Sequence, residues 1–192
     1  MLRNMASHAF LLLLFSPCPP AFLFHFPPSS SYLVNLPLTT PYTTGYIAFF
    51  PNTTDYPLDN APASWSTVPA LRHAMTLYPH TPLLFYLTST ALIMNPALSL
   101  ESHIMQPSRL ESLMIVDKPV VPPDSVIKTF SHLKGDRIDF VLTQDHEGLA
   151  GGSMVLRAGD WAKFFLDTWF DPLYRSYNFQ KAEAHALEHI VQ

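Results

Sequence analysis

Residues 138–157 read IDFVLTQDHEGLAGGSMVLR, and this stretch gives the clearest indication of the fold class. Ile138–Thr143 is an apolar run of strand length, and Ser153–Arg157 is a second run of the same kind. The glycine-rich residues Gly148–Gly152 between them predict a turn. The sequence therefore predicts two neighbouring strands joined by a tight connection.

Helical segments flank these strands. Ser64 or Ser66 can cap a helix that runs to about Tyr78. Its apolar face would consist of Val68, Leu71, Met75 and Tyr78. Asp160 can cap a helix through Phe170, and Asn178 can cap a last helix through Val191.

The segment between the first helix and residue 138 alternates short elements. Leu83–Leu87 is an apolar run that predicts a buried strand, Leu98–Met105 predicts a short helix, and Arg109–Ile115 is another short segment. Asp117–Asp124 is a proline-rich loop. Strands that alternate with helices favour an α/β domain.

Composition limits the possible functions. The 192 residues carry a net charge of −4, so no basic field points to nucleic acid as a partner. Charged residues are 14% of the chain, and residues 1–54 contain one arginine and no acidic residue. Cys18 is the single cysteine, which excludes an internal disulfide.

The sequence divides into an apolar, proline-rich segment, residues 1–44, and a domain, residues 45–192. Ala9–Phe26 is almost wholly apolar but interrupted by prolines, so three interpretations stay open. It is a secretory signal or membrane anchor, a disordered apolar tail, or an artefact of the assigned reading frame. Residues 27–44 read as an uncharged linker.

Residues 45–192 include the stretches SWSTVPALRHAMTLYPH, DFVLTQDHEGLAGGS and WFDPLYRSYNFQKAEAHALEHIVQ. In these stretches, from about Gly45 onward, the chain resembles glycosyltransferase family 34, the fungal galactosyl- and mannosyltransferases. Within that family it is most similar to the α-1,6-mannosyltransferase subunits of the Golgi mannan polymerase complex.

The resemblance implies an α/β domain of GT-A-like (Rossmann-like) fold that binds a nucleotide sugar, incomplete here at both ends. It implies a retaining α-mannosyl or galactosyl transfer to a glycan acceptor, with GDP-mannose as the donor in the mannosyl branch. It also implies a lumenal domain at the Golgi membrane and mannan polymerase subunits as partners. A non-catalytic subunit of that complex and a truncated, inactive family member are the alternatives.

The family places an Asp-x-Asp metal motif where this chain has Thr88-Ser89-Thr90. Carboxylates hold a hard dication such as Mn²⁺ against the diphosphate, and hydroxyls are poor substitutes. We therefore expect Mn²⁺ binding to be weak or absent, with Thr88 and Thr90 as candidate donor- or acceptor-binding residues. As β-branched residues, both also suit a plain structural role in a strand.

Further candidates come from the same resemblance. The turn that ends in Gly151, Gly152 and Ser153 matches a family turn that lines the sugar pocket, where small residues allow close approach. Gln144 and Asp145 end the preceding strand, Gln144 as a binding group and Asp145 as a catalytic carboxylate. Glu183 is the main candidate for stabilising positive charge on the sugar. Solvated surface positions are the alternative for both acids.

Two remaining features have simpler interpretations. His185 and His189 lie one helical turn apart, but no third ligand is evident, so no metal site is assigned to them. The family's metal-ligating histidine lies beyond the residue matched by Gln192. Asn52-Thr53-Thr54 is a glycosylation sequon, which suits a lumenal domain.

Overall fold

The computed structural model describes most of the chain from Tyr46 onward and one short segment before it. The described residues are 10–15, 46–88, 95, 98–121, 125–145, 148–177, 179 and 181–191. Their strands are β1 (Phe10–Phe15), β2 (Tyr46–Phe49), β3 (Leu83–Thr88), β4 (Phe140–Asp145) and β5 (Gly148–Arg157). Their α-helices are α1 (Thr67–Leu77), α2 (Pro107–Leu113), α3 (Asp160–Trp169), α4 (Pro172–Ser176) and α5 (Ala182–Ile190). Single turns of other helix types are η1 (Thr53–Asp55), η2 (Ala63–Ser66), η3 (Glu101–Met105) and η4 (Gly135–Arg137).

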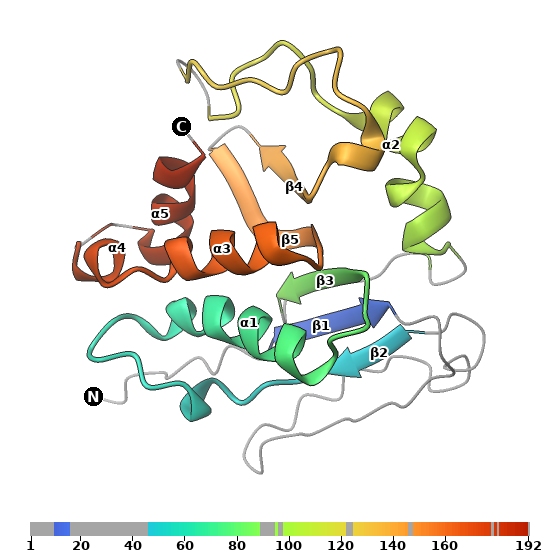
Figure 1. The fold of residues 1–192 in the computed structure, drawn as a ribbon. Coiled ribbons are helices and arrows are strands. Elements are labelled where there is room, and N and C mark those ends of the chain that lie inside the picture. The colour runs from blue at the N-terminus through green and yellow to red at the C-terminus, as the bar shows by residue number, and fades with distance from the viewer. Residues whose placement is uncertain are drawn as a thin grey trace.

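The strands form one five-stranded sheet in the order β2-β1-β3-β5-β4 (Figure 1). Every pairing among the described strands is antiparallel. The domain thus has the expected mixed helix and sheet content. The pairing departs from the parallel strands that a Rossmann-like alternation of strands and helices implies. The β4–β5 pair follows directly from sequence, because strands joined by a short connection pair antiparallel.

Strand β1 lies between β2 and β3, inside the sheet. Phe10 pairs with Thr88 and Phe15 pairs with both Leu83 and Tyr46. The sequence interpretation had placed these residues in an N-terminal segment outside the domain, with the length of a signal-peptide core. An unbroken apolar run of six residues also suits a strand enclosed on both sides, and periodicity alone does not separate the two. No helix among the described residues is long and apolar enough to cross a membrane.

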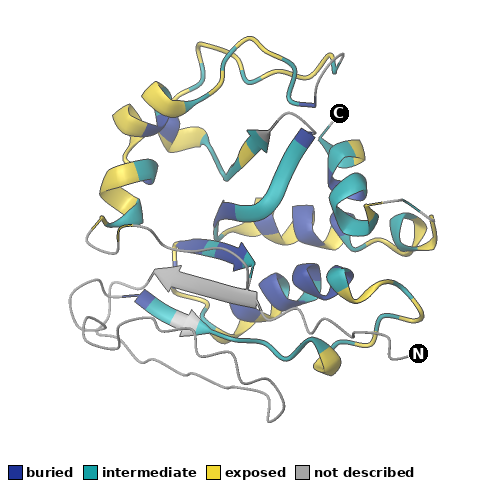
Figure 2. Cartoon of the chain, turned by 180° about the vertical axis from the view of Figure 1, so that it is seen from behind, coloured by how far each residue is buried: buried dark blue, intermediate teal, exposed yellow. Residues whose placement is uncertain are grey.

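One face of the sheet is covered by α1, α3 and α5, and the main core lies beneath them. Figure 2 shows the buried residues of α1 and α3 on the sides where the two helices face each other. The predicted apolar face of α1 is confirmed: Val68 and Leu71 are each 1% exposed and Met75 is buried. The largest fully buried side chains of this core are Trp65, Trp169, Leu71, Leu84, Met154, Leu156, Leu166 and Leu187.

The opposite face carries a smaller core built from residues 100–138 and the outward side chains of the strands. Its buried members are Tyr46, Leu83, Met105, Leu110 and Val155. The Tyr46 hydroxyl donates to Glu101 Oε2 at 2.8 Å and accepts from the Leu100 N–H at 2.9 Å. These bonds fix the short helix η3 against β2.

Three predicted local features differ in detail. The Ser66 hydroxyl donates to the Ala63 carbonyl at 2.7 Å and makes no cap bond, because a 3-10 turn, η2, precedes α1. Asp160 is the first residue of α3 and accepts from Lys163, so Gly159 takes the cap position. Helix α5 begins at Ala182, four residues after Asn178, which lies outside the described residues.

Candidate functional site

Strand β5 loses its register with β4 at the glycine-rich segment. Leu142 pairs with Met154, whereas the next residue, Thr143, pairs with Ala150. Gly151–Ser153 therefore have no partner on β4 and form a bulge. The sequence had predicted a turn over Gly148–Gly152, and this was wrong: glycine here accommodates an irregular strand. Bulges of this kind often lie beside functional sites, where they redirect a strand.

The bulge lies beside the end of β3. Ser153 pairs with Leu87, and a Cβ built on Gly152 would lie 3.5 Å from Thr88 Cγ2 and 3.6 Å from Thr88 Oγ1. A Cβ on Gly151 would have no atom within 4 Å. The structure thus brings together four of the predicted binding residues, Thr88, Gly151, Gly152 and Ser153. Thr90 lies outside the described residues.

The side chain of Gln144 holds a neighbouring loop in place. Its Nε2 donates to the carbonyl of Pro119 at 3.1 Å and to that of Val120 at 2.8 Å. Both amide hydrogens are therefore committed to holding the loop that precedes residue 125, which leaves only the amide oxygen for a ligand. Asp145 pairs through its backbone with Gly148 at the end of β4, and its side chain lies outside the described part of the chain.

Glu183 lies in the first turn of α5, on the helix-covered face of the sheet. Its backbone carbonyl accepts from Trp169 Nε1 at 2.9 Å, and its Oε2 atom is buried. Burial raises the pKa of the Tyr86 phenol, and the negative charge of Glu183 adds to the rise. Tyr86 and Thr88 share a face of β3, since they are two residues apart. The charge of Glu183 is therefore felt at Tyr86, and Thr88 lies further along the same face of β3.

The two histidines of α5 stack on each other. The rings of His185 and His189 lie 5.4 Å apart, and Phe179 contacts both at 5.1 and 5.2 Å. His185 Nδ1 is buried and has no hydrogen-bond partner among the described residues. No group of three or more His, Cys, Asp or Glu side chains in that part of the chain is placed to hold a metal ion.

Residues 42–192 match the model of a family described as the galactosyl transferase GMA12/MNN10 family. The chain belongs to this family. The match confirms the resemblance seen in the sequence and covers the strands β2 to β5 and all five α-helices. No solved structure matches the chain.

Individual relatives carry two kinds of name. An uncharacterized α-1,2-galactosyltransferase of Schizosaccharomyces pombe is 31% identical over 67% of this chain and 39% of its own length. The probable α-1,6-mannosyltransferase MNN10 of Saccharomyces cerevisiae is 30% identical over 67% of this chain and 33% of its own length. MNN11 of the same yeast, named likewise, is 28% identical over 64% of this chain and 30% of its own length. The chain thus spans between about a third and two fifths of these relatives.

Asn52, the sequon asparagine of this family member, caps the short turn η1. Its Oδ1 accepts from the Thr54 N–H at 3.1 Å, and its side chain is held in a surface loop. This bond uses the amide oxygen and leaves the nitrogen, the atom that a glycan would modify, outside the cap.

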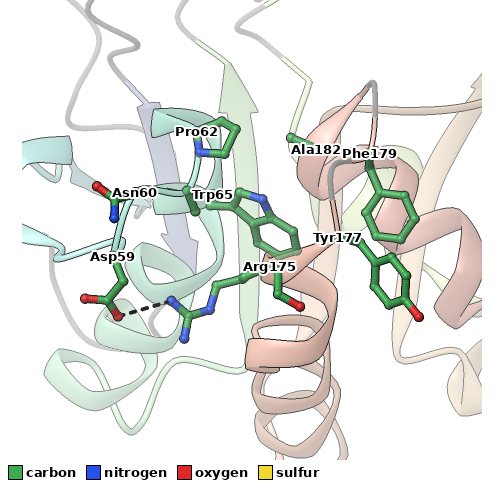
Figure 3. A pocket seen from close by; sticks show the side chains of 10 residues that line it. Asp59, Asn60, Pro62, Trp65, Arg175, Tyr177, Phe179 and Ala182 are labelled. Carbon is green, nitrogen blue, oxygen red and sulfur yellow. Dashed lines mark ion pairs between the residues drawn. The ribbon is translucent and has the colours of Figure 1, made fainter.

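A pocket of about 290 Å³ lies between the segment that precedes α1 and the connection from α4 to α5 (Figure 3). Asp59, Trp65, Arg175 and Tyr177 line it. The sequence interpretation missed this pocket, because its two walls are more than 100 residues apart in the chain. The sequence contained one local indication of this pocket. The stretch SYNF at residues 176–179 combines aromatic and polar residues, and it follows a helix that begins at a proline.

Proposed function

We propose that this chain is a glycosyltransferase that moves a hexosyl group, mannosyl or galactosyl, from a nucleotide sugar to a glycan. One observation carries the proposal: within the matched region, the β5 bulge lies against the end of β3. The names of the relatives support both sugars. GDP-mannose is the donor we favour, and a GT-A-like fold is the arrangement we favour for the domain.

The proposed roles follow from the chemistry of the groups. In the transfer, the bond from the anomeric carbon to the diphosphate breaks and a glycosidic bond forms with retention of configuration. The acceptor hydroxyl passes its proton to an oxygen of the departing diphosphate, and the nucleoside diphosphate leaves. Gly151 and Gly152 allow a sugar to approach the backbone closely, because neither carries a side chain.

Thr88 and Ser153 supply hydroxyls beside that approach, each able to donate and accept a hydrogen bond. The Glu183 carboxylate, partly enclosed by the core, stabilises the positive charge that develops on the sugar ring. In a partly water-excluded setting this stabilisation is stronger than at the surface. Asp145, Thr90 and the Gln144 amide oxygen are further proposed contacts of the donor or acceptor.

The described residues at the end of β3 do not fit a hard divalent cation. Such an ion takes carboxylate and carbonyl oxygens, whereas Thr88 offers a hydroxyl, and no cluster of three suitable side chains lies among the described residues. The proposed reaction therefore uses no Mn²⁺ ion. Donor binding is proposed to depend on hydrogen bonds from the bulge and the neighbouring strand ends.

A Golgi lumenal location and association with mannan polymerase subunits complete the proposal. The relatives named α-1,6-mannosyltransferases, MNN10 and MNN11, support the mannosyl branch. The Asn52 sequon, placed in a surface turn, suits a lumenal domain.

The test is direct transfer by the full chain. The protein is incubated with GDP-mannose or with UDP-galactose and a mannose oligosaccharide, and the acceptor is followed by mass spectrometry. We expect a mass increase of one hexose with one donor, an α linkage in the product, and the same rate with and without Mn²⁺. Absence of transfer from both donors would contradict the proposal, and a strict requirement for Mn²⁺ would contradict its metal-independent form.

A further inference from the structure

The pocket between Asp59 and Tyr177 has two aromatic walls of different character (Figure 3). Trp65 is 1% exposed and forms a fixed inner wall, since it is part of the main core. Tyr177 is 58% exposed and lies at the rim, with its ring 5.4 Å from that of Phe179. An exposed aromatic ring such as that of Tyr177, beside polar groups, suits a ligand with one apolar face and a polar edge. A pyranose ring has this character, because its C–H groups lie on one face and its hydroxyls around the edge.

The two charged groups of the pocket, Arg175 and Asp59, are held in place and have opposite charges. Arg175 Nε donates to the Phe170 carbonyl at 3.1 Å, and its guanidinium lies 4.3 Å from the centre of the Phe170 ring. Arg175 Nη1 lies 3.7 Å from Asp59 Oδ2 across the pocket mouth. The paired charges leave no net positive charge for a diphosphate, while the guanidinium and carboxylate still offer donors and acceptors to hydroxyls.

Three residues that line the pocket have left-handed backbone. Among the described residues, four non-glycine residues have positive φ, and three of them line the pocket: Asp59 (47°), Asn60 (72°) and Ala182 (44°). Aspartate and asparagine adopt this conformation readily, whereas for an alanine it costs free energy. Strain on the pocket wall is therefore confined to Ala182, at the start of α5.

The volume sets the size of the ligand. A pocket of about 290 Å³ is just below the range of about 300–1,000 Å³ that is typical of small-molecule sites. It therefore has room for one sugar ring, and a whole nucleotide sugar is too large.

We propose that this pocket binds one uncharged pyranose residue of the glycan acceptor, away from the bond that is formed. This inference rests on the proposed function, because it takes the acceptor to be a glycan. Ala182, on the pocket wall, directly precedes Glu183, so the first turn of α5 connects the two sites. A glycan held by Tyr177 and Asp59 is thereby positioned relative to the candidate catalytic carboxylate.

The first test measures binding without any donor. The full chain is titrated by calorimetry with an α-linked mannose tetrasaccharide and a galactose-containing analogue. Removing the rim aromatic in Tyr177→Ala should weaken binding of the preferred glycan about fivefold to tenfold. Asp59→Asn should also weaken it, and asparagine tolerates the positive φ at this position. Phe164→Ala, which removes another exposed aromatic outside the pocket, is the matched control and should bind as the unmodified chain does.

The outcomes separate the pocket from the transfer reaction. No glycan binding by the unmodified chain, or equal binding by all variants, would overturn the pocket proposal. If the unmodified chain transfers sugar and Tyr177→Ala shows an unchanged KM for the acceptor, the proposed function stands and the pocket proposal fails. If the chain transfers no sugar but binds the glycan through Tyr177, the pocket proposal stands and the proposed function fails. A thermal unfolding scan of each variant shows that the fold is retained.

Discussion

The two faces of the sheet are packed by different kinds of structure. The face beneath α1, α3 and α5 has a continuous core with Trp65 and Trp169 almost fully enclosed. The other face is covered by short helices and loops, and five residues form its buried cluster. Long amphipathic helices bury a large apolar area, whereas short elements depend on individual hydrogen bonds and close backbone contacts. Substitution of an exposed residue on the first face should therefore change the free energy of unfolding little. On the second face, even the addition of one methyl group should lower it.

The largest expected effect is at the centre of the helix-covered face. Trp169 is 2% exposed, and Trp169→Ala should lower the free energy of unfolding by about 3–5 kcal/mol, since it leaves a cavity and removes the bond to the Glu183 carbonyl. The matched control is Phe164→Ala on the same helix, where the side chain is 70% exposed and the loss should stay within about 0.5 kcal/mol. Urea unfolding measures both. Equal losses would show that α3 is not packed as described.

A single methyl group should disturb the other face. A Cβ on Gly135 would meet the backbone of Pro107, with the Pro107 Cα only 2.7 Å away. Gly135→Ala should therefore lower the free energy of unfolding by about 1–3 kcal/mol, because backbone cannot move aside as a side chain can. Gly151→Ala is the control, with open space around the added Cβ. If Gly135→Ala unfolds at the same urea concentration as the unmodified chain, α2 and η4 do not approach as closely as described.

The smallest expected effect concerns Tyr46, which joins the second face to β2. Tyr46→Phe should lower the free energy of unfolding by about 1 kcal/mol at neutral pH, since the Leu100 N–H and Glu101 lose a partner. Burial raises the pKa of Tyr46 to about 12. Because the unfolded phenol ionises near pH 10 and the folded one later, this residue's contribution declines between about pH 10 and 12. The stability difference between the two proteins should narrow and then reverse over that range, because the free energy lost on ionising the buried phenol exceeds about 1 kcal/mol. A constant difference would contradict the burial of this phenol.

The same difference between the faces explains how much could be predicted from sequence. The apolar face of α1 and the strand at Leu83–Leu87 were predicted correctly, because helical periodicity and a short apolar run are local signals. The place of β1 in the sheet was missed, since six apolar residues suit several structures. Pairing partners decide where such a run belongs, and these lie far along the chain.

The residues of the candidate site stay predictions, and their geometry did not follow from the sequence. The glycines after β4 and the threonine at the end of β3 were identified, yet the bulge that joins them is set by a register change between strands. Gln144 was predicted as a binding group, whereas the structure commits its amide hydrogens to a loop. A side chain's hydrogen-bond partners depend on tertiary contacts, which residue type and spacing do not specify.

The most direct measurement compares the transfer rates of two carboxylate variants. Glu183→Gln removes the charge proposed to stabilise the sugar, and Asp167→Asn removes an exposed charge on α3 that pairs with Arg72. With the donor that the unmodified chain uses, kcat of Glu183→Gln should fall about 100-fold, whereas Asp167→Asn should retain the full rate. A Glu183→Gln variant that is folded and transfers sugar at the unmodified rate would contradict the account.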